Sequence, residues 1–227
     1  MANQTEEKNH EIIVEMKNID MRFQGVHALD DVSITLRRGE VHALMGENGA
    51  GKSTLMKILV GLYVPTKGEI YYKGKQVHFK SVMDTKKAGI SMIFQEFNQV
   101  KYMMVMENIY LGREPMTRTG CVDYQKMYED SKRLLEGLGV DLDPKARMAD
   151  LTVAKFQLVE IVKAISYDAD VIIMDEPTSA LSQTEIEYLL KTVRRLCDQG
   201  KAIVFISHKL EEVYGEINTI ALSIPVW

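Results

Sequence analysis

Apolar residues fall into short runs along this chain, and most runs are bounded by glycine, proline or charged residues. Runs of four to eight residues that are rich in β-branched side chains are typical of buried β-strands. Residues 11–23 and 28–36 alternate in part between apolar and polar positions, around a turn at Gln24-Gly25, and predict two N-terminal strands. The apolar runs predict further strands at residues 41–45, 69–72, 90–94, 171–174 and 202–206.

Other segments carry apolar residues three and four positions apart, which is the spacing of one face of an α-helix. The spacing predicts helices at residues 52–62, 124–138, 151–166 and 184–197. Strands that alternate with helices predict an α/β fold built on a parallel sheet. The stretch from about 96 to 166 is helical in character, so we expect it to form a helical subdomain inserted into that fold.

Composition limits what the chain can be. Its 227 residues carry a net charge of −4, which gives no sign of a nucleic-acid-binding surface. Cys121 and Cys197 are too few for a disulfide framework or a metal cluster. No run approaches the ~18 apolar residues of a membrane-spanning helix, so we expect any membrane role to be peripheral. Residues 1–10 are polar and acidic and predict a flexible tail rather than a secretory signal.

A glycine-rich loop lies between the strand at 41–45 and the helix at 52–62. The pattern G-x-x-x-x-G-K-[ST] needs glycines because the backbone must curl until successive N–H groups point at phosphate oxygens. Lys52 can reach the β- and γ-phosphates of ATP, and the Ser53 hydroxyl can ligate Mg²⁺. We expect the ATP-binding residues to be Gly46, Glu47, Asn48, Gly49, Ala50, Gly51, Lys52, Ser53 and Thr54. The fold expected is therefore a P-loop nucleotide-binding core with an N-terminal antiparallel β-subdomain and an inserted helical subdomain.

Two carboxylates end the predicted strand at 171–174. Asp175 would hold Mg²⁺, directly or through water, and Glu176 would orient and polarise a water that attacks the γ-phosphate. An Asp-Glu pair at a strand end is often only a solvated turn, but a phosphate loop in the same chain favours the catalytic interpretation. His208 follows the strand at 202–206. It is either a surface or helix-capping residue or a contact to the γ-phosphate, and periodicity does not choose between these.

Taken together, these motifs resemble the ATP-binding-cassette ATPase subunit of monosaccharide importers of the ribose, galactose and xylose type, specifically its first ATPase half. The resemblance covers about residues 12–214 and rests on five segments: 45–54, 89–96, 111–115, 174–181 and 206–212. It implies one ATPase domain over residues 11–214. It also implies a peripheral location at the cytoplasmic face of the membrane, with transmembrane permease subunits, a second ATPase half and, indirectly, an external sugar-binding protein as partners.

The resemblance also implies roles for single residues. Gln95 would sense Mg²⁺ and the γ-phosphate and couple them to the permease, and His208 would contact the γ-phosphate. Phe23 would stack on adenine, although as a bare sequence feature it would more often be a core residue. Residues 179–182 would form the loop that meets the opposing ATPase half.

Two features depart from the family pattern. Residues 151–155 stand where the family carries Leu-Ser-Gly-Gly-Gln; Thr152 keeps a hydroxyl at a predicted helix N-terminus, but Lys155 replaces the usual glutamine. Residues 215–227 form a divergent end that does not align with the family. We therefore expect a truncated chain whose sheet lacks its last strands, with apolar surface near Ile206 left uncovered.

These departures leave more than one function open. The leading expectation is an ATP hydrolase that energises sugar uptake. The alternative is a truncated nucleotide-binding fragment without productive turnover, which Lys155 and the missing second half favour. A cassette ATPase that acts on nucleic acid or ribosomes is disfavoured by the acidic net charge, so we expect no nucleic-acid partner.

Overall fold

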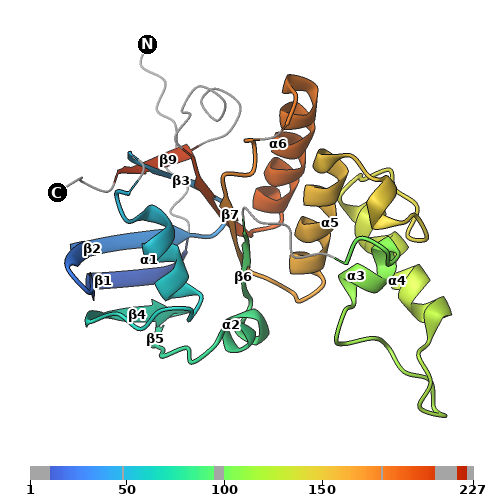
Figure 1. The fold of residues 1–227 in the computed structure, drawn as a ribbon, viewed down its shortest axis with the longest axis horizontal. Helices are drawn as coiled ribbons and strands as arrows, with labels where there is room; N and C mark the ends of the chain where they lie inside the picture. The colour runs from blue at the N-terminus through green and yellow to red at the C-terminus, as the bar shows by residue number, and fades with distance from the viewer. Residues whose placement is uncertain (1–10, 48, 95–99, 180, 208–218, 224–227) are drawn as a thin grey trace.

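The computed structural model describes residues 11–47, 49–94, 100–179, 181–207 and 219–223, the last of these as backbone only. Two β-sheets lie side by side at one end of the molecule, and helices extend away from them toward the other end (Figure 1). An antiparallel sheet has the strand order β2-β1-β4-β5. Its strands are β1 (Ile12–Phe23), β2 (Val26–Arg37), β4 (Lys67–Tyr72) and β5 (Lys75–Gln76).

The second sheet is parallel throughout and has the order β6-β7-β8-β3-β9. Because its strands are parallel, their carboxyl ends meet at one edge, where α/β folds place ligands. The strands are β3 (Val41–Met45), β6 (Ile90–Ile93), β7 (Val171–Asp175), β8 (Ala202–Ile206) and β9 (Thr219–Ser223).

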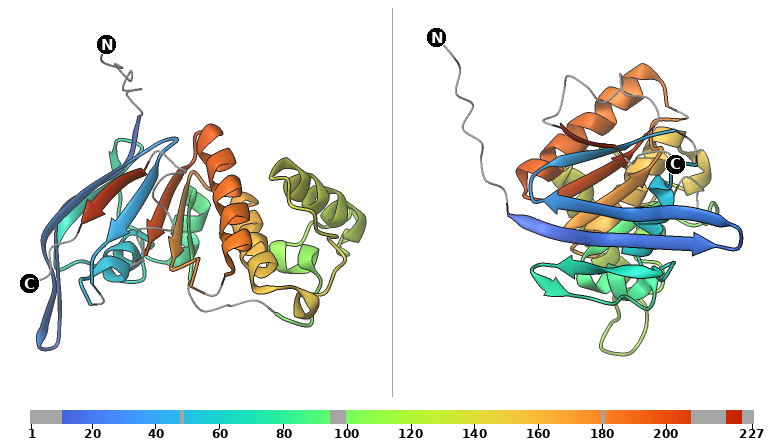
Figure 2. Two further views of the ribbon diagram at one scale, coloured as in Figure 1. Left: turned by 90° about the horizontal axis from the view of Figure 1, so that it is seen from above. Right: turned by 90° about the vertical axis from the view of Figure 1, so that its left-hand side faces the viewer.

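Helices cover both faces of the parallel sheet. One face meets α1, which packs between the two sheets, whereas α5 and α6 pack on the opposite face and α3 and α4 lie beyond them (Figures 1 and 2). The helices are α1 (Lys52–Leu59), α2 (Val82–Ala88), α3 (Val105–Ile109), α4 (Tyr124–Gly137), α5 (Val153–Ile165) and α6 (Gln183–Asp198), with a short 3₁₀ helix at Met148–Asp150.

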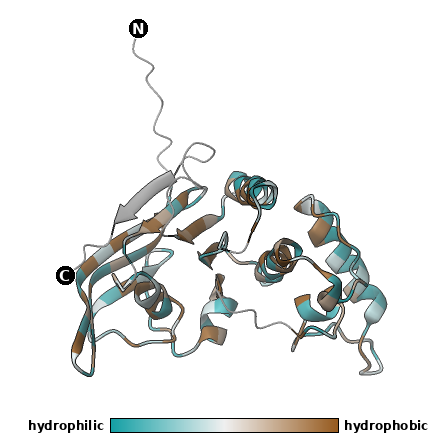
Figure 3. Cartoon of the chain, turned by 45° about the horizontal axis from the view of Figure 1, so that its top comes forward, coloured by the Kyte–Doolittle hydropathy of each residue, from teal (hydrophilic) through white to brown (hydrophobic). Residues whose placement is uncertain are grey.

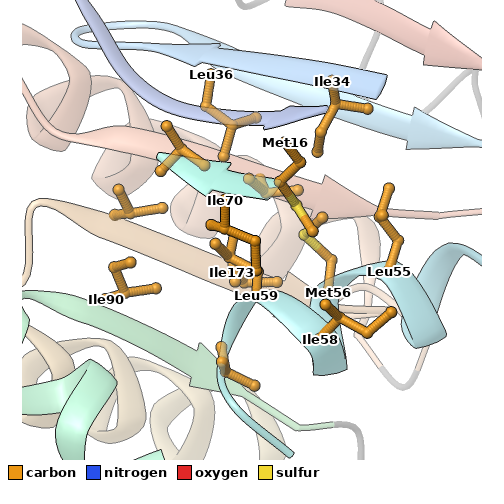
Figure 4. Packing of buried hydrophobic residues seen from close by; sticks show 14 of the residues in the cluster. Met16, Ile34, Leu36, Leu55, Met56, Ile58, Leu59, Ile70, Ile90 and Ile173 are labelled. Atoms are coloured by element: carbon orange, nitrogen blue, oxygen red, sulfur yellow. The ribbon is translucent and has the colours of Figure 1, made fainter. Parts of the chain in front are cut away.

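Alternation along the strands divides the core into two parts. Val171 and Ile173 of β7 face the core that holds α1 and the antiparallel sheet, while Ile172 and Met174 face the core under α5 and α6. This follows from the two-residue period of a strand, and a strand buried on both faces reads as a continuous apolar run. Figure 4 shows the first core, in which Leu59 of α1 lies among residues of both sheets. Figure 3 shows the contrast with α4, where hydrophilic residues predominate along the helix.

Asp170 ties the two sheets together at the edge opposite the phosphate loop. Its carboxylate accepts hydrogen bonds from Arg38 Nη1 at 3.0 Å and from Lys73 Nζ at 2.6 Å, and Lys73 follows β4 of the other sheet. Burial alone would raise the pKa of Asp170, but the bonds from Lys73 and Arg38 lower it to about 2. The carboxylate therefore stays charged wherever the protein is folded near neutral pH.

The predicted strands and helices are present with small shifts at their ends. The helix predicted at 52–62 is shorter, because α1 ends at Leu59 and Gly61 adopts a left-handed φ of 73°. The expectation that apolar surface near Ile206 is left uncovered was wrong. Residues 219–223 form β9, which pairs in parallel with β3, and Ile206 is only 1% exposed. The expected uncovered surface near Ile206 is thus absent from the described part of the chain.

Candidate nucleotide-binding site

The glycine-rich loop connects β3 to α1 at the carboxyl edge of the parallel sheet. Gly46, Gly49 and Gly51 have φ values of 146°, 90° and 87°, which residues with a side chain rarely adopt. Gly51 is also the N-cap of α1, and a Cβ placed there would lie 2.6 Å from the Ala28 carbonyl oxygen of β2. The loop conformation therefore requires glycine at position 51 for two independent reasons.

The first turn of α1 presents backbone donors. It contains no acidic residue, and Gly51 offers no side chain to cap the N–H groups. These groups and the positive end of the helix favour an anion at this point. Ser53 and Thr54, both partly buried, lie in this turn. The local sequence thus builds a cradle for phosphate, as the motif predicts.

Lys52 is buried, with 6% of its surface exposed. Its ammonium donates to the carbonyl oxygens of Gly46 at 2.6 Å and of Glu47 at 2.8 Å. Both acceptors belong to the glycine-rich loop. The Lys52 ammonium therefore lies next to the loop backbone that a phosphate would contact. A buried cation at this place supplies the positive charge that bound triphosphate needs.

Ser53 and Asp175 come together although they are far apart in the sequence. The Ser53 hydroxyl donates to Asp175 Oδ1 at 3.3 Å, joining the start of α1 to the end of β7. Burial is the main cause that raises the pKa of Asp175; the Ser53 hydroxyl opposes it, and the nearby Glu176 charge adds to it. A hydroxyl and a carboxylate oxygen are hard donors that suit Mg²⁺, and a cation would stabilise the charged form of this carboxylate.

Glu176 has a strained backbone at the end of β7. Its φ is 46°, a left-handed conformation that is uncommon for a residue with a side chain. Its N–H donates to the Ile206 carbonyl oxygen at 3.0 Å, so the ends of β7 and β8 are tied together. Strain held in this way fixes the direction in which the chain leaves the sheet directly after Asp175.

Three expected site residues lie outside the described residues: Asn48, Gln95 and His208. The strands that lead to two of them are described, since β6 ends at Ile93 and β8 ends at Ile206. Both strands end at the same edge of the sheet as β3 and β7. The roles of these three residues stay predictions.

The segment with the unusual lysine begins α5. Thr152 is the N-cap of this helix, and its hydroxyl oxygen accepts the Lys155 N–H at 3.4 Å. The predicted helix N-terminus at Thr152 is therefore confirmed, and the Lys155 side chain is exposed on the first turn.

Phe23 is the last residue of β1 and is 40% exposed, so it is not a core residue. Its ring meets that of Tyr63 with centroids 5.4 Å apart. Tyr63 is not among the residues expected from the sequence, because a lone tyrosine after a helix carries no motif. The signal that could have found it is spatial, since the two rings are brought together by segments far apart in the chain.

The comparison with protein families decides the assignment. The family model for ABC transporters matches residues 29–179, which include the phosphate loop and the two carboxylates at the end of β7. The chain belongs to the ABC transporter family. Among the residues that the structure describes, there is no helix long and apolar enough to cross a membrane.

Curated relatives within this family have similar sequences over most of the chain. A putative ribose/galactose/methyl galactoside import ATP-binding protein of Agrobacterium fabrum is 52% identical over 206 residues, which are 91% of this chain and 40% of the relative. A galactose/methyl galactoside import ATP-binding protein of Pasteurella multocida is 48% identical over 98% of this chain and 44% of its own length. The chain thus spans less than half the length of these relatives. The second alignment covers all but a few residues of this chain.

Solved structures confirm the predicted fold. An ATP-binding cassette of an ABC transporter in its ADP conformation has a TM-score of 0.82 and 26% identity, and the alignment covers 95% of this chain and 90% of that one. A nucleotide-free ATP-binding cassette has a TM-score of 0.80 and 26% identity, over 94% of this chain and 88% of that one. A dimeric cassette at 23% identity and a TM-score of 0.76 shares the fold.

Proposed function

We propose that this chain binds ATP with Mg²⁺ and hydrolyses it to energise the uptake of a monosaccharide through a membrane permease. One observation carries the proposal: the Ser53 hydroxyl and the Asp175 carboxylate lie 3.3 Å apart, beside the buried Lys52. A phosphate cradle, a buried cation and two hard oxygen donors at one sheet edge are the parts that phosphoryl transfer needs.

The residues divide the chemistry between them. The loop N–H groups and Lys52 would hold the phosphates, and Ser53 and Asp175 would hold the metal ion. Mg²⁺, when bound, neutralises charge on the β- and γ-phosphate oxygens. Glu176 orients a water and accepts its proton while the water oxygen bonds to the γ-phosphorus. The bond to the bridging oxygen breaks, and ADP and phosphate result.

Three further roles complete the proposed site. Gln95 joins the metal site and relays its state to the permease, and His208 contacts the γ-phosphate. Phe23, exposed at the end of β1, stacks on adenine. These roles come from the family pattern and not from described contacts to nucleotide.

We infer sugar import from the curated relatives, which are import ATP-binding proteins for ribose, galactose and methyl galactoside. The transmembrane permease subunits would hold the chain at the cytoplasmic face of the membrane. A second ATPase half would complete the site, in keeping with the dimeric state named for one cassette of the same fold. An external sugar-binding protein would act through the permease, and no nucleic acid takes part.

The alternative function is nucleotide binding without productive turnover. Lys155 favours it, because this exposed cation stands on the first turn of α5 where the family usually carries a glutamine. ATP binding with no phosphate release, even with permease and partner ATPase present, would establish this alternative.

The test of ATP binding replaces Lys52 with alanine and measures MgATP affinity by calorimetry. We expect at least a tenfold loss, because the variant removes the buried charge that faces the phosphates. Lys132→Ala is the matched control, since this lysine is exposed on α4. Equal affinity in the Lys52 variant and the control would overturn the assignment of the phosphate loop.

A further inference from the structure

Two aromatic rings meet at the turn end of the β1–β2 hairpin. Phe23 ends β1, and Tyr63 lies in the loop that follows α1. Their ring centroids are 5.4 Å apart and their planes are inclined by 76°, an edge-to-face pair. This geometry is attractive because the positive edge of one ring meets the negative face of the other.

Both rings remain open to a further partner. Phe23 is 40% exposed and Tyr63 is 36% exposed. In an edge-to-face pair, each ring keeps at least one face clear of the other ring. A flat aromatic group can therefore stack on Phe23 without displacing Tyr63.

Backbone bonds hold the two segments in place. Thr66, three residues after Tyr63, donates its N–H to the Asp20 carbonyl oxygen at 2.8 Å. The Thr66 hydroxyl accepts the N–H of Arg22 at 3.2 Å, next to Phe23. The Tyr63 N–H in turn donates to the Lys57 carbonyl oxygen of α1 at 3.3 Å. The ring contact is thus fixed by the fold on both sides.

The pair lies at the end of the hairpin that touches the phosphate loop. Phe23 pairs with Val26 of β2, and Ala28 follows two residues later on the same strand. The Ala28 carbonyl oxygen is the atom that a Cβ on Gly51 would meet at 2.6 Å. A nucleotide whose phosphates lie in the loop can therefore extend its base toward Phe23.

We infer that Tyr63 is a positioning residue that holds the Phe23 ring ready to stack on the adenine of ATP. This inference rests on the proposed function, because it needs ATP in the phosphate loop and adenine on Phe23. Tyr63 acts through Phe23 and makes no contact with the phosphates. Tyr63 fixes the orientation of the Phe23 ring before the nucleotide arrives. Nucleotide binding therefore does not lose free energy to ordering that ring.

The test compares the affinity of the full chain for MgATP with its affinity for magnesium tripolyphosphate, both by calorimetry. Phe23→Ala is expected to lower ATP affinity about tenfold, the usual effect of losing one stacked base. Tyr63→Ala is expected to lower it by about threefold to tenfold, in line with the strength of an edge-to-face pair. Tyr63→Phe keeps the ring and should bind ATP as the unmodified chain does. The affinity for tripolyphosphate should be unchanged in all three variants.

Two controls separate the inference from a general effect on folding and from the proposed function. Tyr102→Ala removes a tyrosine that is 90% exposed elsewhere and should change neither affinity. The double variant Phe23→Ala/Tyr63→Ala should bind ATP no more weakly than Phe23→Ala alone, because Tyr63 acts through Phe23.

Each failure has its own meaning. Unchanged ATP affinity in Tyr63→Ala, with a loss in Phe23→Ala, overturns the role of Tyr63. It leaves the stacking of adenine on Phe23 supported. Additive losses in the double variant, or an equal loss of tripolyphosphate affinity in Tyr63→Ala, overturn the role of Tyr63 as well. Unchanged ATP affinity in Lys52→Ala overturns the proposed function instead.

Discussion

His42 is a buried histidine on the strand that leads into the phosphate loop, and it makes the stability of the protein depend on pH. Its side chain is 1% exposed, and Nε2 accepts the Arg37 N–H at 2.9 Å. Nδ1 has no hydrogen-bond partner within the described residues. The Glu40 carboxylate lies 3.7 Å from Nε2 and would attract a proton, but Nε2 already accepts the Arg37 N–H. Burial is the largest cause that lowers the pKa of His42, from 6.5 to about 4.

The sign of the effect follows from the two pKa values. Between pH 6.5 and about 4 the unfolded chain binds a proton at His42 and the folded chain does not, so stability falls as the pH falls through this window. Above pH 6.5 both states are neutral at this residue and the effect vanishes. The loss at pH 5 relative to pH 7.5 amounts to about 2 kcal/mol.

Urea denaturation at pH 7.5 and pH 5 measures this difference. His42→Gln keeps an acceptor for the Arg37 N–H and removes the titrating group, so about 2 kcal/mol of the pH dependence should disappear. His78→Gln, at an exposed histidine, should retain it. The same pH dependence in His42→Gln and in the unmodified chain would show that His42 is not its source.

Three further variants test other parts of the structure. Gly51→Ala should lower the free energy of unfolding by about 1–2 kcal/mol or more and abolish ATP binding, because φ is 87° and the new Cβ would meet the Ala28 carbonyl oxygen. Circular dichroism measures the stability and calorimetry the ATP affinity, and normal affinity would contradict the prediction. Asp170→Asn should lower the free energy of unfolding by about 1.5–3 kcal/mol, because the charge that attracts Arg38 and Lys73 is lost. Urea denaturation measures this, and an unchanged midpoint would contradict it. Asp175→Asn should leave metal-free ATP affinity intact but remove its increase with Mg²⁺ in titrations, and a retained increase would argue against the metal site.

Much of the fold follows from local patterns. The buried strands at 41–45, 171–174 and 202–206 are continuous apolar runs, and a parallel sheet buried on both faces produces that pattern. The approach of Ser53 to Asp175 follows from topology, because parallel strands end at the same edge. The loop motif and the two carboxylates were therefore accessible from the sequence.

Other features depend on pairing between distant segments, which periodicity does not encode. β9 is a five-residue strand whose place beside β3 is a long-range contact, so it was not among the strands that the sequence predicts. The bonds of Asp170 to Arg38 and Lys73 join three separate segments, and the contact of Tyr63 with Phe23 joins two. No local spacing distinguishes these residues from solvated ones.

Single-turnover hydrolysis tests whether Glu176 acts as the base in ATP hydrolysis. The chain and its Glu176→Gln variant are loaded with MgATP, together with permease and partner ATPase, and phosphate release is followed in time. We expect equal ATP binding in both, with release at least about a hundredfold slower in the variant, because the residue that orients the water and takes its proton is lost. Equally fast release by the variant would contradict the assignment of Glu176 and with it the proposed hydrolytic site.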